Sequence, residues 1–389
     1  MDGAKFAKML SDKHLFELDR MEYKYSVSSV NEFTELLRQN FAQSLPLVDF
    51  SSDELFYLPN LARISTNGMK QLLSAPASNQ SFGLQAMTEE IHATFQIESI
   101  HSSRNSIRHI LNGYAPRNEE ESRIYGMKRG LDFIADRQNT ITEENLHQLY
   151  QISTGDYLPD EGRLLPDHFY RHDVVYVVDG EESREGLPAQ QLPDAMKRLV
   201  DFANAKDGIN ELHKAAILYF AFAYYHPYFD GNGRTARLLH LWYLVQQGYP
   251  AALFTPFSRY IAESKAAYYK AYNRVEKNAL ISGYTDVTPF LSYFCNEVYN
   301  RLQVDAAPPQ ADLQVYQTAL AEGKITEKER LLWEYVLSAY GTEEFTTKQL
   351  EKDFRNAAYA TIRTFVMKFH EMELLVARKT GNRVFYKVK

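Results

Sequence analysis

Along most of the chain, apolar residues recur at intervals of three or four positions, the pattern of helices with one buried face. In the first hundred residues this spacing predicts helices over 33–45, 60–75 and 84–100. In the second half of the chain it predicts helices over 192–205, 211–225, 235–247, 264–277 and 287–302. The pattern therefore indicates a mainly α fold.

One segment departs from this spacing. HDVVYVVD, residues 172–179, is rich in β-branched and aromatic residues and bounded by turn formers, so we predict a short strand or hairpin. The longest apolar run, residues 215–225, is about half as long as a bilayer span requires and predicts a buried core helix. The charged N-terminus lacks the apolar stretch of a secretory signal. We therefore expect a cytoplasmic protein without a membrane partner.

A second pattern begins after the adjacent prolines near residue 308, which cannot continue a helix. Helical spacing over 327–340, 345–354 and 357–373 is followed by two apolar segments that TGN joins as a hairpin. Three helices and a hairpin predict a winged helix-turn-helix domain. The expected organisation is an N-terminal helical region (1–110), a core domain (111–303), a linker (304–323) and a winged-helix domain (324–389).

Charge separates the last region from the rest. The chain has 389 residues and a net charge of −7, which argues against a protein that coats nucleic acid along its whole length. Residues 324–389 carry 13 Lys and Arg against 9 Asp and Glu, a local balance of +4. A single cysteine, Cys295, excludes an internal disulfide framework and a metal cluster built on thiolates.

The segment HPYFDGNGRTAR, residues 226–237, combines residue types that suit chemistry on a polyphosphate. The Gly-Asn-Gly turn at 231–233 can direct backbone N–H groups at an anion, and a helix starting there adds the positive end of its dipole. Arg234 and Arg237 lie on one helical face and can both reach a phosphate chain. Asp230 is a hard oxygen ligand of the kind that Mg²⁺ takes beside phosphates.

His226 adds a side chain that accepts a proton near neutral pH. With the turn, the carboxylate and the arginines, it indicates phosphoryl or nucleotidyl transfer to a hydroxyl. Each feature alone has a simpler interpretation, because a histidine after an apolar helix is usually structural and Gly-Asn-Gly is usually only a turn. Their order and spacing within twelve residues favour the catalytic interpretation.

This segment resembles the signature of the Fic family, H-x-F-x-[D/E]-G-N-G-R-x-x-R, with Tyr228 in the usual Phe position. Either ring can anchor the loop in a core. The resemblance extends from about Met87 to Tyr299, with residues 169–178 at the place of the family's flap hairpin and residues 257–272 at that of its post-motif helix. It implies a Fido-fold helical core with a short β-hairpin flap.

The resemblance further implies transfer of AMP from ATP to a Tyr, Thr or Ser hydroxyl of a protein, possibly the protein itself, with Mg²⁺ or Mn²⁺. His226 would deprotonate the hydroxyl and Asp230 would hold the metal ion. The implied nucleotide-binding residues are Gly231, Asn232, Gly233, Arg234, Arg237, Tyr268 and Tyr269. The target backbone would pair with the flap at Val175, Tyr176 and Val177. For the two tyrosines, core packing is an equal alternative.

A second motif, ATFQIES at 93–99, is similar to the family's inhibitory pattern [S/T]-x-x-x-E-[G/N], with Ser99 as a departure. Thr94 and Glu98 lie one helical turn apart on one face. In the family such a glutamate pairs with the second arginine, here Arg237, and competes with the γ-phosphate for it. A solvated helical glutamate is the simpler alternative.

Two enzymatic alternatives stay open beside adenylyl transfer. The carboxylate of Glu98 could orient a water against an AMP-modified side chain, which would make the protein a de-AMPylase or a bifunctional enzyme. A kinase of the Doc type is disfavoured, because Gly233 leaves room for an α-phosphate where those relatives carry a bulkier residue.

The third alternative is a DNA-binding regulator whose Fic core senses a nucleotide. Residues 357–371 would be the recognition helix, and Arg363, Lys368, Arg378, Lys379 and Arg383 would contact DNA. The modest charge and the apolar Phe365, Met367 and Phe369 argue for packing instead. Winged helices also bind proteins or form homodimers, so a homodimer is a further hypothesis.

Overall fold

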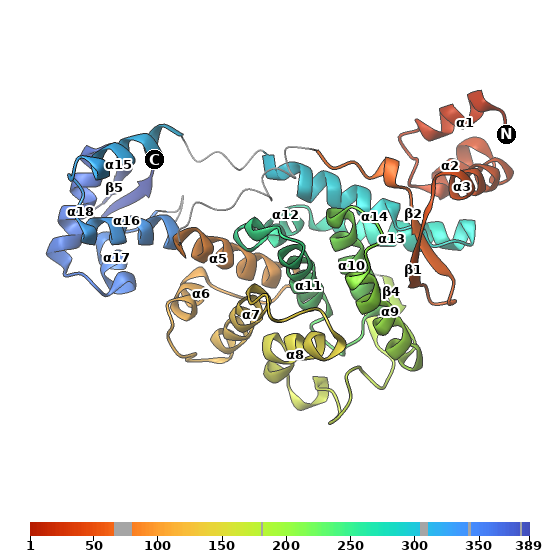
Figure 1. The fold of residues 1–389 in the computed structure, drawn as a ribbon, viewed down its shortest axis with the longest axis horizontal. Helices are drawn as coiled ribbons and strands as arrows, with labels where there is room; N and C mark the ends of the chain where they lie inside the picture. The colour runs from red at the N-terminus through yellow and green to blue at the C-terminus, as the bar shows by residue number, and fades with distance from the viewer. Residues whose placement is uncertain (66–79, 180–181, 304–309, 341–343, 382) are drawn as a thin grey trace.

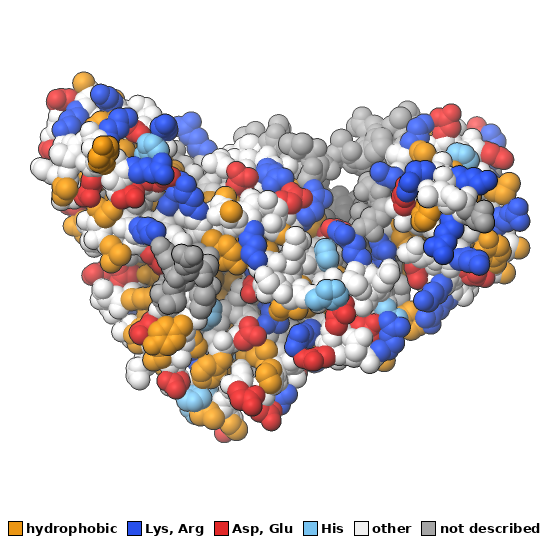
Figure 2. Space-filling model, turned by 180° about the vertical axis from the view of Figure 1, so that it is seen from behind, with side chains coloured by type: hydrophobic (Ala, Val, Ile, Leu, Met, Phe, Trp, Pro, Cys, Tyr) orange, Lys and Arg blue, Asp and Glu red, His pale blue; other side chains and the backbone are white. Residues whose placement is uncertain are grey.

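The computed structural model describes residues 1–65, 80–179, 182–303, 310–340, 344–381 and 383–389. The first helices and the last helices lie at opposite ends of the molecule, with the largest group of helices between them (Figure 1). Seen from behind, the surface carries side chains of both charges, and Lys and Arg gather over the C-terminal end (Figure 2). Within these ranges, no helix combines the length and apolar character needed to cross a bilayer.

The N-terminal end consists of three helices and a hairpin. The elements are α1 (Gly3–Leu10), α2 (Leu18–Tyr25), α3 (Val27–Phe41), β1 (Gln43–Val48), β2 (Glu54–Tyr57) and a 3-10 turn (Pro59–Leu61). The helix predicted over 33–45 is wrong beyond Phe41, because alternate residues of β1 are buried as a strand requires. Most of the helix predicted over 60–75 lies outside the described residues.

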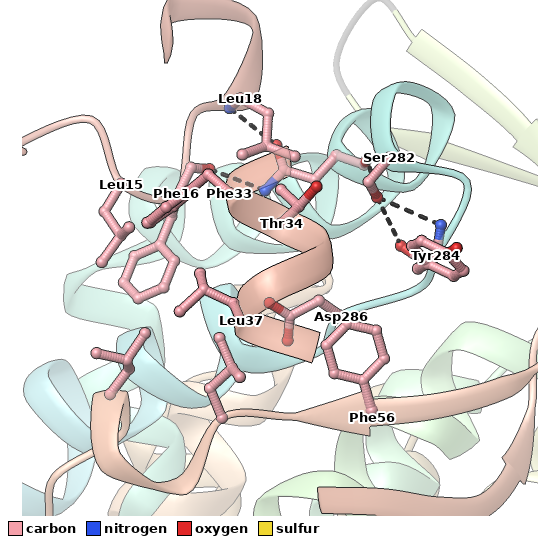
Figure 3. Close-up of a pocket in the computed structure, with 13 residues that line it drawn as sticks. Leu15, Phe16, Leu18, Phe33, Thr34, Leu37, Phe56, Ser282, Tyr284 and Asp286 are labelled. Carbon is pink, nitrogen blue, oxygen red and sulfur yellow. Dashed lines mark hydrogen bonds between the residues drawn. The ribbon is translucent and has the colours of Figure 1, made fainter. Parts of the chain in front are cut away.

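A small cavity of about 40 Å³ marks the junction between this end and the central helices. Leu37 of α3 and Phe56 of β2 border it, and Asp286 lies beside them (Figure 3). Asp286 accepts hydrogen bonds from the Thr288 N–H, at 2.9 Å, and the Thr288 hydroxyl. Burial raises the pKa of Asp286 to about 6, because desolvation outweighs the two hydrogen bonds.

The central region is almost entirely helical. Its helices are α5 (Gln80–Ile97), α6 (Arg104–Leu111), α7 (Glu119–Ala135), α8 (Glu143–Ser153), α9 (Leu192–Asn204), α10 (Glu211–Tyr225), α11 (Asn232–Gln246), α12 (Phe257–Glu263), α13 (Lys265–Ser282) and α14 (Thr288–Tyr293). Short turns lie at Gly155–Tyr157, Asp160–Gly162, Ala189–Gln191 and Pro250–Phe254, and α14 continues as Phe294–Val298 and Tyr299–Gln303. The hairpin of β3 (Tyr176–Asp179) and β4 (Glu182–Glu185) confirms the predicted strand. The prediction of a mainly α fold is confirmed.

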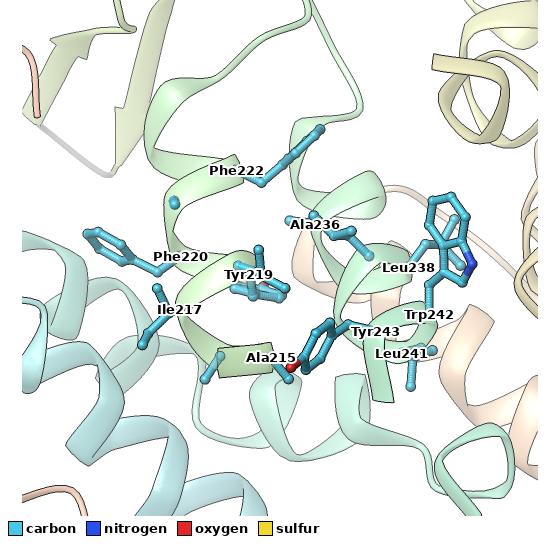
Figure 4. Close-up of a cluster of buried hydrophobic side chains, with 14 of the residues drawn as sticks. Ala215, Ile217, Tyr219, Phe220, Phe222, Ala236, Leu238, Leu241, Trp242 and Tyr243 are labelled. Carbon is cyan, nitrogen blue, oxygen red and sulfur yellow. The ribbon is translucent and has the colours of Figure 1, made fainter. Parts of the chain in front are cut away.

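Helices α10 and α11 form the centre of this core. Tyr219 and Phe222 point from α10 toward α11, whereas Ile217 and Phe220 point to the opposite side (Figure 4). All four side chains are fully buried. Because α10 is covered on all sides, its position and that of the segment after it are fixed by packing.

The C-terminal region has the element order that the sequence predicts. After α15 (Gln310–Ala321), where a linker was expected, come α16 (Glu327–Ala339), α17 (Thr347–Phe354), α18 (Tyr359–Glu371), β5 (Leu375–Thr380) and β6 (Arg383–Val388). Phe365 and Phe369 are buried in the cluster that these elements share, but Met367 is 49% exposed, so the expectation that it packs is wrong. Thr346 caps α17, because its side chain accepts from the Gln349 N–H.

The C-terminal region also contacts the central helices. Helix α16 packs against α5 (Figure 1). The Asn112 amide donates to the Tyr335 hydroxyl at 3.1 Å, and the Arg355 guanidinium lies 3.4 Å from the ring centre of Tyr114. The large central cluster includes α5 and α6, so the core crosses the boundary expected at residue 110.

Candidate active site

The segment 226–237 connects α10 to α11. His226 adopts a left-handed conformation with φ 55° while its N–H still donates to the Phe222 carbonyl, at 3.1 Å. Pro227 then prevents the helix from continuing. The chain therefore turns sharply at His226, whose side chain lines the same cavity as the start of α11.

The turn is held by the side chain of Asn232. Its Oδ1 accepts from the Tyr228 N–H and its Nδ2 donates to the Tyr228 carbonyl, both at 2.8 Å. Tyr228 is fully buried and stacks on Tyr150 with ring centres 3.6 Å apart, which confirms that this ring anchors the loop. Because the Asn232 side chain is used internally, only its backbone N–H is available for the predicted nucleotide contact.

Gly231 cannot be replaced without strain. Its φ is 82°, and an added Cβ would overlap the methyl group of Thr154. Its carbonyl accepts from the N–H and hydroxyl of Thr235, at 2.9 and 3.0 Å. The glycine thus starts α11 at a point where the first-turn N–H groups are left for an anion.

These elements surround a cavity of about 340 Å³. Its lining residues are Ile97, Glu98, Tyr176, Val177, Ala223, His226, Phe229, Asp230, Gly231, Asn232, Gly233, Tyr268, Tyr269, Tyr272, Asn273 and Glu276. Most of the side chains predicted for catalysis, phosphate, adenine and flap contacts therefore meet in one place. Tyr268 is nearly buried and shares a hydrogen bond of 3.0 Å with the Tyr219 hydroxyl, so core packing accounts for much of this ring, whereas Tyr269 is half-buried.

Asp230 lies at the mouth of the cavity. Its side chain is 57% exposed, and its Oδ1 accepts from Arg234 Nη2 at 3.2 Å. Within the described residues no three metal-binding side chains form a cluster. A single exposed carboxylate fits a magnesium ion that takes its other ligands from phosphate and water.

Arg237 is 3% exposed and reaches across to α5. Its Nε donates to the Thr94 hydroxyl, and its Nη2 lies 2.5 Å from Glu98 Oε1. Burial opposes the charged form of Arg237, but the carboxylate of Glu98 outweighs it and holds the pKa above the ordinary value. Among the described residues, Nη1 of Arg237 has no hydrogen-bond partner.

The carboxylate of Glu98 also covers Gly233. A Cβ at Gly233 would overlap Glu98 Oε1 and lie 3.2 Å from Arg237 Nη1. Glu98 follows the last residue of α5, and Ser99 is left-handed with φ 57°. That conformation explains why the resembled pattern has Gly or Asn at this position, since both tolerate it better than most residues.

Helix α5 has a second attachment to the core. Glu90 is buried and accepts from the Ser258 N–H at 2.9 Å and from the Ser258 hydroxyl at the start of α12. Burial raises the pKa of Glu90, although Ser258 and Arg237 lower it in part. Glu90 was not predictable from the sequence, because an acidic residue on a predicted helix gives no sign of a partner 168 positions away.

The flap hairpin lies beside the base. Tyr176 is 65% exposed, and within the described residues β3 pairs only with β4, which leaves one edge of β3 for another strand. Val175 precedes the strand, and its carbonyl accepts from the Gly186 N–H at 3.0 Å. Strand β3 itself begins at Tyr176, and the target contact predicted for Val175, Tyr176 and Val177 stays a prediction.

Two of the five cations predicted to contact DNA are used within the protein. The Lys368 ammonium lies 2.7 Å from Glu329 and 2.6 Å from the Lys324 carbonyl. Arg378 forms an ion pair with Glu344. Both ion pairs support local packing, and the DNA contact of these two residues stays a prediction. Arg363, Lys379 and Arg383 are exposed, and their role stays a prediction.

Comparison with known proteins agrees with this site. The Fic/DOC family model matches residues 140–244. The chain is 26% identical over 182 residues to protein adenylyltransferase fic-1 of Caenorhabditis elegans, covering 45% of this chain and 31% of that protein. It is 28% identical over 140 residues to protein adenylyltransferase Fic of Drosophila willistoni, covering 35% of this chain and 26% of that protein. The matches thus span less than a third of either relative's length.

Among solved structures, a Fic family protein from Desulfovibrio desulfuricans G20 is similar in fold. The TM-score is 0.53 at 16% identity, covering 84% of this chain and 97% of the other. Fold and site together define a helical domain with a glycine-flanked helix start beside a histidine. Residues 140–244 match the Fic/DOC family, and the fold is similar to that of a solved Fic family protein.

Proposed function

We propose that this protein transfers AMP from ATP to a hydroxyl group of a protein and that Glu98 restrains the transfer. The observation that carries the proposal is the shared use of Arg237. The buried guanidinium of Arg237 pairs with Glu98, and Glu98 lines the same cavity as His226 and the glycine-flanked start of α11. A triphosphate placed along Gly231–Gly233 would need the same guanidinium.

The proposed reaction uses His226, Asp230 and the main chain of 231–233, which line the cavity, and Arg234, which pairs with Asp230. His226 accepts the proton of the target hydroxyl, whose oxygen bonds to the α-phosphorus. The bond from that phosphorus to the oxygen bridging to the β-phosphate breaks, and pyrophosphate leaves. The backbone N–H groups at the start of α11 and Arg234 stabilise the phosphate charge. A magnesium ion on Asp230 would neutralise further charge when bound.

The decisive experiment compares wild type with Glu98→Gly in the presence of ATP labelled at the α-phosphate. Losing one charge-assisted competitor, worth about 1.5–3 kcal/mol, should raise labelling of the protein or of a partner on the order of 10- to 100-fold. Glu89→Gln is a matched control, because Glu89 lies on the same helix and pairs with Arg104. His226→Ala added to Glu98→Gly should abolish labelling while ATP still binds.

Absence of label from Glu98→Gly with ATP bound would contradict the proposal. Parallel incubations with α-labelled CTP, GTP and UTP identify the donor. A transfer of the labelled γ-phosphate in place of the α-phosphate would show the kinase alternative instead.

The reverse reaction is a second candidate. The Glu98 side chain is 30% exposed and borders the cavity that contains His226, so its carboxylate can orient a water there. The test uses self-labelled Glu98→Gly as the substrate for unlabelled wild type. Release of AMP by wild type but not by Glu98→Gly would support hydrolysis, and no release would reject it.

A further inference from the structure

Arg171 lies just before the flap and is 2% exposed. Its guanidinium donates to main-chain carbonyls of three segments. Nε donates to the His226 carbonyl at 2.8 Å, Nη1 to the Asp173 carbonyl at 2.6 Å, and Nη2 to the Leu187 carbonyl. One side chain therefore connects both ends of the flap to the residue that carries the imidazole.

Main-chain hydrogen bonds reinforce the same connection. The Arg171 N–H donates to the Pro227 carbonyl at 2.9 Å, and the Leu187 N–H donates to the Tyr225 carbonyl at 3.2 Å. The residues on each side of His226 are thus bonded to the two ends of the flap. The left-handed conformation of His226 lies within this network.

Burying a cation on carbonyl oxygens is expensive in free energy. Burial lowers the pKa of Arg171, and the nearby Asp173 offsets this only in part. A planar guanidinium can donate in several directions at once, which an ammonium on a flexible stem does less well. The geometry therefore indicates that Arg171 fixes the two ends of the flap relative to the segment at His226.

We propose that Arg171 is a positioning residue that sets the place of the flap edge relative to the His226 imidazole. This inference rests on the proposed function, because it concerns how a target hydroxyl is presented to the base. The flap would position a target strand that pairs with β3. The segment 226–237 positions the His226 imidazole, the proposed proton acceptor. A displacement of about 1 Å between the two would cost roughly 100-fold in rate.

Arg171 is packed tightly against Gly186 at the end of the flap. A Cβ added at Gly186 would lie 2.8 Å from Arg171 Nη2, 3.0 Å from a Val175 methyl and 3.3 Å from His226 Cβ. Gly186→Ala should therefore disturb the same relation without removing a charge. It provides an independent variant in case replacement of Arg171 unfolds the protein.

The test measures Arg171→Gln, Arg171→Lys and Gly186→Ala in the full-length Glu98→Gly background. Transfer to the protein itself is followed with α-labelled ATP, and ATP affinity is measured by calorimetry. We expect transfer to fall about 10- to 100-fold in Arg171→Gln and less in Arg171→Lys, with the Kd for ATP within about twofold of the parent. Arg171 does not line the cavity, so nucleotide binding should persist.

Arg163→Gln is the matched control, since Arg163 precedes the flap but is half exposed and donates to the Leu158 carbonyl. Hydrogen exchange at Gly186 and Leu187 should increase in Arg171→Gln and stay at the parent level in Arg163→Gln. Transfer at the parent rate, or parallel losses of transfer, ATP affinity and melting temperature, would overturn the inference while the proposed function stands. A parent that binds ATP but transfers nothing would instead refute the proposed function, and the inference with it.

Discussion

Under the proposed function, Arg237 pairs with one of two anions, the Glu98 carboxylate or a phosphate. Its burial increases the strength of whichever ion pair forms. In a site of low polarity an ion pair is worth more than at the surface, and losing one partner leaves a costly unpaired charge. In this structure the carboxylate of Glu98 pairs with the guanidinium. Under the proposed function, a phosphate would have to replace that carboxylate.

Gly231 gives the first residue-scale prediction. Gly231→Ala places a Cβ against the Thr154 methyl at a backbone angle that alanine avoids. We expect a loss of about 1–3 kcal/mol in unfolding free energy and loss of labelling in the Glu98→Gly background. Urea unfolding and α-labelled ATP measure the two effects.

Thr154→Ser is the companion change, because it removes the overlapping methyl group. In Gly231→Ala it should recover part of the lost stability but not all, since the backbone strain remains. Equal stability of Gly231→Ala and wild type would show that the turn tolerates a side chain.

Individual roles were only partly predictable from the sequence. The twelve-residue segment indicated the base, the carboxylate and the arginines because they are neighbours in the chain. Arg171 and Glu90 act on residues far along the chain, so periodicity gave no sign of their partners. The hydrogen bonds of the Asn232 side chain within the loop could not be predicted for another reason. An amide side chain after a glycine is equally suited to holding a turn and to binding a ligand.

At the scale of elements, α5 is attached to the core at two levels. Glu90 contacts the start of α12, one turn later Thr94 contacts Arg237 of α11, and Glu98, which follows the end of α5, pairs with the same arginine. The hydrogen bonds of Glu90 should affect how often the contacts with Arg237 break, because helix α5 carries both sets of contacts. Under the proposed function, restraint would therefore depend on helix α5 as well as on Glu98.

Ser258→Ala tests this coupling. Without its hydroxyl the buried Glu90 loses one of its two donors, which should cost about 1–3 kcal/mol in the docking of α5. We expect faster hydrogen exchange in α5 and higher labelling of the otherwise wild-type protein. Ser264→Ala, at the end of α12, is the control, because its hydroxyl bonds Tyr260 and Tyr293. Looser α5 without more labelling would contradict the coupling.

Elements with strong periodicity were predictable and mixed segments were not. Residues 211–225 were predicted as a helix and match α10, since packing and its Asn210 cap agree with the pattern. Strand β1 contains Pro46 and follows directly on a helical spacing, so the three-residue period obscured its alternation. Tertiary pairing with β2 decided its conformation.

At the scale of the whole molecule, the described residues form three clusters of buried side chains that meet at two junctions. The junction near the N-terminal end contains Asp286, whose main chain also pairs with Phe56 of β2. Its raised pKa makes stability depend on pH. The folded state holds this proton up to about pH 6, whereas an unfolded aspartate releases it near pH 3.9.

The expected consequence is that Asp286 contributes stability below about pH 4 that is lost as the pH rises through about 6. The size is about 3 kcal/mol if the whole shift is expressed. Asp286→Asn cannot release a proton and should lack this component. Urea midpoints at pH 4.5 and pH 7 for both proteins measure it as a difference, which cancels the other carboxylates. Identical pH dependence of the two proteins would contradict it.

The second junction places α5 between the central core and α16. Displacing α5 as a rigid body would require both of these surfaces to separate. Under the proposed function, binding of a triphosphate in the cavity and binding of a molecule to the C-terminal region would therefore be linked in free energy. A molecule that binds the C-terminal region better when α5 has moved must strengthen triphosphate binding. The triphosphate must then strengthen the binding of that molecule by an equal factor.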